Sequence, residues 1–203
     1  MTEKMWYNLL LEDNYIMEET DHGQDYIKCR VERASPTVDW EHCWRLARLS
    51  GLGPDNMTFL FKLLHQILPT QERVARTKPG TRSSCKMPGC HVEVDNLEHS
   101  LIFCQSNDDV GLLLLELLRG ITPALQPQSL LRLEFHVEPE LELPVVFFIS
   151  TVLNSLWNLR QSGNRVQKYL VRSQMEAKIN LLRETRHSAT VVKLEEFTLS
   201  MFH

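Results

Sequence analysis

The sequence lacks an apolar run long enough to cross a membrane. The longest one, from Leu143 to Trp157, is interrupted by Asn154, whereas a spanning helix needs about 20 apolar residues. The first residues also lack a charged segment followed by an apolar one, which is the pattern of a secretory signal. The five cysteines are odd in number and lack the spacing of a disulfide framework. We therefore expect an intracellular protein, nuclear or cytoplasmic, without membrane contact.

Catalytic motifs are missing as well. The sequence contains no metalloprotease histidine pair, no glycine-rich phosphate loop, no nucleophile elbow and no deaminase pattern. The adjacent pair Asp108-Asp109 lacks the aromatic residue that precedes the aspartates of a reverse transcriptase, and it is better explained as a helix start. The sequence therefore predicts a protein that is not an enzyme.

What the sequence does contain is a cluster of metal-ligand residues. Three of the five cysteines lie with a histidine in the pattern Cys85-x4-Cys90-x8-His99-x4-Cys104, with the turn-forming Pro88-Gly89 inside the first pair. Sulfur and imidazole ligands favour Zn²⁺, and four protein ligands leave no position for an activated water. We expect one structural zinc ion.

The second pair of ligands requires a change in helix geometry. Residues five apart are separated by about 140° on a regular helix, so one face cannot present both His99 and Cys104. The helix must end or tighten near Phe103. His91 is an alternative fourth ligand, although adjacent ligands such as Cys90 and His91 rarely reach the same ion.

Length and composition fit a single helical domain. The chain has 203 residues, of which 43% are hydrophobic and 24% charged, enough to bury a sizeable core. We expect residues 1–36 to form an N-terminal helix and connector packing on the main body, with Tyr26–Val31 a short strand or a connector. Residues 37–203 are expected to form a mostly α domain stapled by zinc, with a possible short strand pair.

Helix signals are clearest between residues 39 and 77. Asp39 can cap a helix that buries one face including Cys43, and Pro54 can open the next helix, with Lys62, His65 and Gln66 on its exposed side. A short basic helix should end near Thr77. Cys43 and Cys29 are interpreted as buried core residues.

The later segments are less uniform. We expect a central helix from Asp108 to Arg119 capped by Asn107, a strand or a helix over Leu131–Val137, and an apolar helix starting at Pro144 and ending at Ser162-Gly163. A mixed basic and apolar helix should follow over 165–186. The tail from Ser188 alternates weakly, which predicts an edge strand or a disordered segment.

Charge alternates sharply along the chain behind a net charge of −4. Residues 61–90 carry six basic side chains against one acidic one, and residues 158–193 carry eight against two. If the two blocks meet they form a phosphate-binding patch, and if they scatter they are only solvated faces. The candidate phosphate contacts are Lys62, Arg73, Arg76, Lys78, Arg82, Lys86, Arg160, Arg165, Lys168 and Arg172.

These residues together resemble a known family. The run at 59–70, Arg73, the cysteine pair and Leu97-Glu98-His99 with Cys104 are similar to the zinc-binding domain that follows reverse transcriptase in non-LTR (LINE-type) retrotransposons. Looser matches extend over residues 3–172; they are the lysine-aromatic-leucine run at 3–10, the tryptophans Trp40 and Trp44, and the tryptophan-arginine run at 155–160.

The resemblance implies a zinc site on Cys85, Cys90, His99 and Cys104, and a role in holding template RNA or target DNA beside a polymerase. The first pair departs from the family, because it has four intervening residues where two are usual. No polymerase or endonuclease signature is present, so the chain is either a fragment of a larger element or a domesticated host protein.

Two functions follow. The first is a non-catalytic module that binds RNA or single-stranded DNA through the basic residues. The second is a protein interaction or dimerisation module in which zinc is purely structural, using apolar surfaces of the helices at 108–119 and 144–160. The overall acidity favours the second, whereas the basic blocks favour the first.

Overall fold

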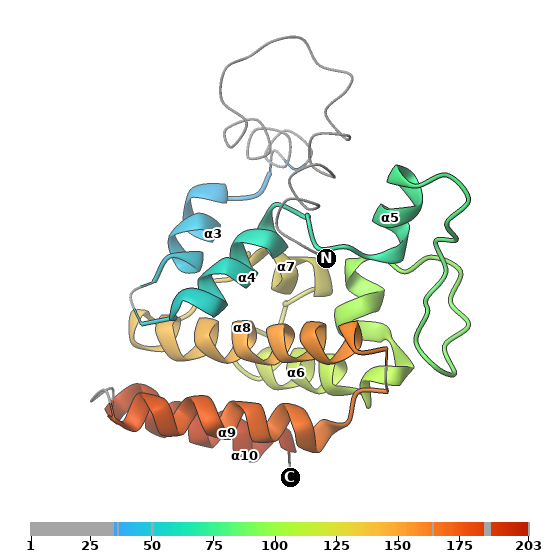
Figure 1. The fold of residues 1–203 in the computed structure, drawn as a ribbon. Coiled ribbons are helices and arrows are strands. Elements are labelled where there is room, and N and C mark those ends of the chain that lie inside the picture. Colours follow the sequence, from blue (N-terminus) through green and yellow to red (C-terminus); the bar gives the residue numbers. More distant parts are fainter. Residues whose placement is uncertain (1–34, 36, 50, 164, 185–187, 203) are drawn as a thin grey trace.

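The structure, a computed structural model, describes residues 35, 37–49, 51–163, 165–184 and 188–202 (Figure 1). The expected N-terminal helix, the segment Tyr26–Val31 and Cys29 lie outside these residues. The described part is built from helices and contains no strand. It confirms the expectation of a mostly α domain with a cluster of three cysteines and a histidine.

The helices are short in the first half of the chain and longer in the second. They are α3 (Trp40–Ala47), α4 (Pro54–Leu64), α5 (Gln71–Thr77), the π-helix η1 (His99–Phe103), the 3-10 helix η2 (Gln105–Asn107), α6 (Val110–Arg119), α7 (Pro127–Arg132), α8 (Pro139–Gln161), α9 (Lys168–Glu184) and α10 (Ser188–Phe202).

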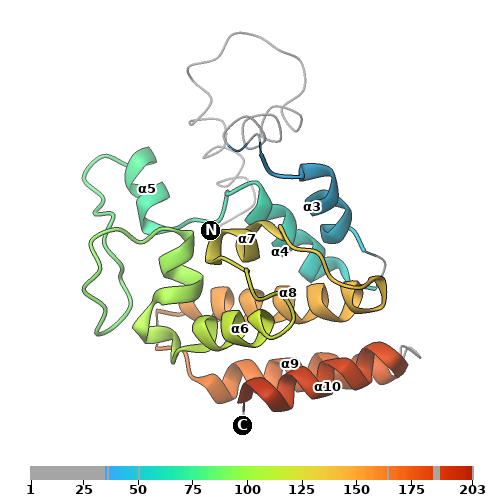
Figure 2. The same ribbon diagram turned by 180° about the vertical axis from the view of Figure 1, so that it is seen from behind.

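Helix α8 forms the centre of the fold. It contacts α3, α4, α6, α9, α10 and η1, and Figures 1 and 2 show α4 on one side of it and the α9–α10 pair on the other. Its 23 residues are long and apolar enough to cross a membrane, but 72% of its most apolar window is buried inside the protein. The core position therefore accounts for its apolar composition.

Helix α8 begins earlier than Pro144, contrary to the expectation from sequence. Pro139 occupies the first turn, where a missing N–H costs no hydrogen bond, and Pro144 lies inside the helix. Glu140 and Glu142 follow Pro139 in the first turn, where carboxylates interact favourably with the helix dipole. The end of the helix at Gln161, before Ser162 and Gly163, agrees with the sequence analysis.

Helices α3 and α4 form largely as expected. The Asp39 side chain accepts a hydrogen bond from the His42 N–H at 3.0 Å, and Cys43 is fully buried. His65, expected on the exposed face of α4, is instead buried at 4% exposure. It caps the end of the helix, hydrogen-bonds the Phe61 carbonyl at 2.8 Å and packs 4.7 Å from the Trp44 ring. This histidine is a core residue.

Two expected strands are absent from the described part of the chain. Leu131 belongs to α7. In the segment that follows, Leu133 and Phe135 are buried and His136 is exposed, but this segment does not pair with a strand in the described part of the chain. The tail is the helix α10, which buries Val191, Leu194, Thr198 and Met201 at helical spacing. Helix α10 packs mainly against α9. Tertiary packing therefore decides the conformation of this tail, whose sequence pattern is weak.

Helix α6 lies against η1 at very short range, although it is not the central helix that its composition predicted. A Cβ atom added to Gly111 would lie 2.1 Å from the Leu101 carbonyl oxygen and 2.5 Å from the Ile102 Cα. Only glycine permits this approach of the two backbones. The contact joins the core of the protein directly to the segment that carries His99 and Cys104.

Candidate metal centre

The four expected ligands converge. The sulfur atoms of Cys85, Cys90 and Cys104 and a ring nitrogen of His99 all lie within 4.8 Å of one another. The Cys85 and Cys104 sulfurs are 3.9 Å apart, and the Cys90 sulfur is 3.4 Å from His99 Nε2. A tetrahedral site with metal–sulfur bonds of about 2.3 Å requires edges of about 3.8 Å between sulfurs and about 3.5 Å to nitrogen. The cluster can therefore hold one metal ion.

A short hairpin presents the first two ligands. The Cys85 N–H donates to the Val92 carbonyl at 3.0 Å, and the Asp95 N–H donates to the Ser83 carbonyl at 2.8 Å. The turn between them has Gly89 at a φ of +75°, as the Pro88-Gly89 pair predicted. The expected strand pair is therefore present only as two backbone hydrogen bonds, too few to form a regular ladder.

The second two ligands lie at the ends of η1. Its π-helical turn is wider than an α-turn, and the helix ends at Phe103, which is the first of the two alternatives expected from the sequence. Cys104 is extended, with φ −70° and ψ 117°. The widened turn and the extended residue together bring a histidine and a cysteine that are five residues apart to one point.

A buried polar group lies directly behind the sulfurs. The guanidinium of Arg160, from the end of α8, donates to the Cys85 sulfur at 3.6 Å and to Asp95 Oδ1 at 3.1 Å. Asp95 also accepts from the Ser100 hydroxyl at 2.6 Å, and Asn107 Oδ1 lies 3.4 Å from Arg160 Nη1. Such groups orient metal ligands and balance the charge of thiolates. The sequence analysis did not assign this role to Asp95, Ser100, Asn107 or Arg160, because no local spacing marks it.

The protonation of the ligands depends on this environment. Burial raises the pKa of the Cys85 thiol to about 12, against the opposing hydrogen bonds from Met87 and Arg160. Burial also lowers the pKa of His99, with Asp95 partly offsetting it, which keeps the imidazole in the neutral form that binds metals. A bound cation would stabilise the thiolate form of the cysteines.

His91, the alternative fourth ligand, is exposed and lies outside the cluster. Cys43 is buried on α3. Burial raises the pKa of its thiol to about 12, and the negative charges of Glu134 and Asp39 contribute smaller increases. The structure thus separates one packing cysteine from three that share a site.

The expected phosphate-binding residues differ in their burial and in their partners. Arg160 is buried at 8% exposure and faces Asp95, so its assignment as a nucleic-acid contact is wrong. Arg76 pairs with Glu72 and Arg172 pairs with Glu176, whereas Arg73 donates to the Gln66 carbonyl. The Lys168 ammonium lies 5.9 Å from the centre of the Phe202 ring.

The remaining cations lie in two places. Lys78, Arg82, Lys86 and Arg165 are exposed, the first three between α5 and Cys90 and the last between α8 and α9. Figures 1 and 2 show these two connections at the same end of the molecule. Lys62 is half-buried on α4 and lines a separate cleft.

Two further expectations are also wrong. Asn107 does not cap α6, because its amide donates to the Ser100 carbonyl at 2.7 Å. Asp108 accepts from the Lys168 backbone N–H at 3.0 Å and so caps the start of α9. Most apolar side chains of α8 are buried inside the protein, whereas Leu112, Leu113 and Leu117 of α6 are only partly buried against the core. The expected partner surfaces on these two helices stay a prediction.

No family model matches this chain, and neither the curated proteins nor the solved structures include a significantly similar one.

Proposed function

We propose that Cys85, Cys90, His99 and Cys104 bind one Zn²⁺ ion and that this ion is structural. Three sulfurs and one imidazole are a donor set typical of zinc, and four protein ligands complete its tetrahedral shell. Arg160 supports the assignment, because its guanidinium donates to the Cys85 sulfur and so favours the thiolate form of that cysteine. A closed shell gives the ion no open position for substrate, so the proposed protein is non-catalytic.

We further propose that the end of the molecule fixed by this ion binds RNA or single-stranded DNA through phosphate contacts. Between residues 78 and 94 the exposed charged side chains are Lys78, Arg82 and Lys86 against Glu93. None of these three cations has a hydrogen-bond or ion-pair partner among the described residues. Such contacts position a strand without reading its sequence.

The observation that supports this proposal most directly is a chain of hydrogen bonds across the metal centre. The Ser106 hydroxyl donates to the Pro88 carbonyl at 2.7 Å, and the Val166 N–H donates to the Ser106 carbonyl at 2.9 Å. Arg165 directly precedes Val166 at one end of this chain, and Lys86 lies two residues before Pro88 at the other. The hydrogen bonds therefore tie the segment that carries Arg165 to the metal loop.

The resemblance to the retrotransposon zinc domain agrees with this proposal, and we propose that the chain derives from such an element. Its departure from the family spacing between Cys85 and Cys90 does not prevent the two sulfurs from reaching a common centre.

The test is a titration of the full chain with a labelled single-stranded RNA at several salt concentrations. Each phosphate contact contributes about 0.7 to the slope of log affinity against log salt for single strands. The triple variant Arg82→Gln, Lys86→Gln, Arg165→Gln should therefore lower the slope by about 2 and weaken binding at low salt.

A control matched in charge removes three exposed cations outside the metal loop, with Arg48→Gln after α3, Arg183→Gln on α9 and Lys193→Gln on α10; the last two pair with Glu195 and Glu196. The net charge changes equally, so a loss caused by overall charge alone would appear in both variants. Absence of salt-dependent binding by the unmodified protein at micromolar concentration would overturn the nucleic-acid proposal.

An interaction module is the second candidate, and exposed apolar residues beside the metal loop favour it. Val92, Val94 and Phe103 are 41%, 45% and 45% exposed. They would contact a protein partner or a second copy of the chain, and this candidate predicts no salt-sensitive binding of RNA.

A further inference from the structure

Helix α8 carries one polar stripe on an otherwise apolar surface. Asn154, Asn158 and Gln161 are spaced by four and three residues, which places them on the same side of the helix. Most of the other residues in this half of α8 are buried. Asn158 and Gln161 are exposed and Asn154 is half-buried, so these amides form the solvent-facing side of α8 and are available to a ligand.

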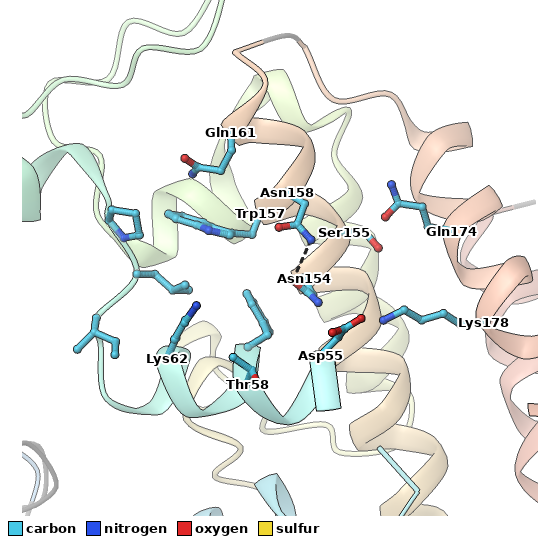
Figure 3. Close-up of a pocket in the computed structure, with 14 residues that line it drawn as sticks. Asp55, Thr58, Lys62, Asn154, Ser155, Trp157, Asn158, Gln161, Gln174 and Lys178 are labelled. Carbon is cyan, nitrogen blue, oxygen red and sulfur yellow. Dashed lines mark hydrogen bonds between the residues drawn. The ribbon is translucent and has the colours of Figure 1, made fainter. Parts of the chain in front are cut away.

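The stripe faces a cleft of about 830 Å³ between α4, α8 and α9. Figure 3 shows Asn158 and Gln161 projecting from α8, Lys62 entering from α4, and Gln174 and Lys178 pointing inward from α9. Asn158 Nδ2 donates to Asn154 Oδ1 at 3.1 Å, which orients the two amides. The remaining amide atoms of this pair have no hydrogen-bond partner among the described residues. The side-chain amides of Gln161 and Gln174 have none there either.

One wall of the cleft holds a fixed cation. Lys178 Nζ donates to Asn56 Oδ1 at 2.7 Å, and Asn56 Nδ2 donates in turn to the buried Thr151 hydroxyl at 3.0 Å. An ammonium group has three hydrogens, so two remain for a ligand. Burial lowers the pKa of Lys178, against the charge of Asp55, and an anion in the cleft would relieve this cost.

The other wall is aromatic. The indole of Trp157 and the ring of Phe59 line the cleft beside Lys62. Figure 3 shows Trp157 and Lys62 on the same side of the opening. The cleft therefore combines two cations, one carboxylate (Asp55), four amide side chains and two aromatic rings. Its volume lies in the range that holds small molecules.

We propose that this cleft binds a nucleoside phosphate, either free or as one unit of a single strand, an inference that rests in part on the proposed nucleic-acid function. Lys62 contacts the phosphate, whereas the charge of Lys178 on the opposite wall is partly balanced by Asp55. Asn154, Asn158 and Gln161 pair with the polar edge of the base, since an amide offers a donor and an acceptor side by side, as base edges do. The rings of Phe59 and Trp157 are mostly buried, and the part of them that lines the cleft provides apolar contact for the base.

An acidic peptide is the competing ligand for two lysines. Its backbone N–H and C=O groups could pair with the amide stripe as well as a base edge does, so the amides alone do not separate the two ligands. The apolar lining of the cleft, which includes Ile67, Leu68 and Trp157, fits the apolar face of a base better than it fits carboxylate side chains. The observations therefore favour the nucleotide.

The experiment follows the side-chain amide signals of asparagine and glutamine by NMR in the full chain carrying its metal. The probes are adenosine monophosphate, a 12-nucleotide single-stranded RNA and a polyglutamate peptide. We expect the signals of Asn154, Asn158 and Gln161 to shift with the RNA. A shift with the mononucleotide too would identify a free nucleotide as a sufficient ligand, and a shift with the RNA alone would identify a strand.

Two variants test the roles of the side chains. Asn158 and Gln161 are exposed, so Asn158→Ala with Gln161→Ala should leave the melting temperature unchanged while weakening nucleotide binding about tenfold or more. Lys62→Gln should weaken it similarly by removing a phosphate contact. Gln167→Ala, an exposed amide just before α9, is the matched control and should have no effect.

The results separate this inference from the proposed function. If RNA binds through Arg82, Lys86 and Arg165 while the cleft variants bind normally, the cleft inference is wrong and the proposed function stands. If cleft signals shift with nucleotide and the basic-end variant is unaffected, the cleft inference stands alone. Amide shifts with polyglutamate as large as those with nucleotide, or no amide shifts with any probe, would overturn the inference.

Discussion

Arg160 and Asp95, 65 residues apart in the sequence, form a buried ion pair at 3.1 Å directly behind the candidate metal ligands. The same guanidinium nitrogen reaches the Cys85 sulfur at 3.6 Å and the Ser100 hydroxyl at 3.4 Å. The pair therefore links the end of the core helix α8 to both halves of the metal centre. It explains how the loop is held against the helical body.

Replacing Arg160 with methionine should destabilise the protein and weaken metal binding together. The change leaves the Asp95 carboxylate buried without its cation, which typically costs about 3–5 kcal/mol of unfolding free energy. Loss of a group that orients metal ligands typically lowers affinity by about 10- to 100-fold. Denaturant unfolding and competition with a metal chelator measure the two effects.

The control for Arg160→Met is Arg165→Met, because Arg165 is exposed and should change stability by no more than about 0.5 kcal/mol. The double variant with Asp95→Asn should cost less than the sum of the single changes, since neither charge is then left unpaired. Full additivity of the two changes would contradict the ion-pair explanation.

Gly111→Ala should strain the contact between α6 and η1. The added Cβ meets backbone atoms at 2.1 and 2.5 Å, and backbone cannot rotate away as a side chain can. We expect a loss of about 1–3 kcal/mol in unfolding free energy, the usual range for overpacking, and a weaker metal site. Gly120→Ala, where the nearest atom is the Leu117 carbonyl oxygen at 3.1 Å, should have a much smaller effect on both measurements.

The two histidines near the hairpin should behave differently on substitution. His99→Ala removes a ligand of the cluster and should change the absorption spectrum of the cobalt-substituted protein, because tetrahedral coordination by four protein ligands is lost. His91→Ala removes an exposed side chain and should leave the spectrum unchanged. The reverse pattern would identify His91 as the ligand.

The bridge between Arg45 and Glu142, which joins α3 to α8 at 2.6 Å, should give a small pH-dependent stability. The hydrogen bond from Arg45 lowers the pKa of Glu142 below its ordinary value, against a smaller opposing effect of burial. A carboxyl whose pKa is lower in the folded state than in the unfolded state stabilises the protein at pH values above its unfolded-state pKa of about 4.3. This stability is lost as the pH falls through the folded-state pKa.

Melting temperatures of the unmodified protein and of Glu142→Gln should therefore differ at pH 7 and converge under strongly acidic conditions. The difference should be small, because the Arg45 side chain is 49% exposed. Glu140→Gln, an exposed carboxylate in the same first turn, serves as the control and should show no such convergence.

The parts of the fold that the sequence predicted depend on short-range chemistry. Asp39 caps α3 through the N–H three residues later, and Pro88-Gly89 forms the turn that joins two ligands. The spacing of Cys85, Cys90 and Cys104 identified the metal cluster for the same reason. In each case the interacting groups lie close together along the chain.

The parts that the sequence did not predict depend on distant contacts. Arg160 has the composition of a surface cation, and only the arrival of Asp95 from another segment makes its burial favourable. The position of His65 on a polar side of α4 predicts exposure, but the Trp44 ring packs against it and it is buried. The tail has a weak helical pattern, and its packing against α9, α8 and α6 defines the buried face of α10.

The account depends most directly on the metal content of the purified protein. Elemental analysis of the full chain should find one zinc ion per molecule, and the ion should be lost in the separate variants Cys85→Ser, Cys90→Ser and Cys104→Ser. It should be retained in Cys43→Ser, which removes a buried cysteine outside the cluster. A protein with no bound metal, or one whose metal content is the same in all four variants, would contradict the account.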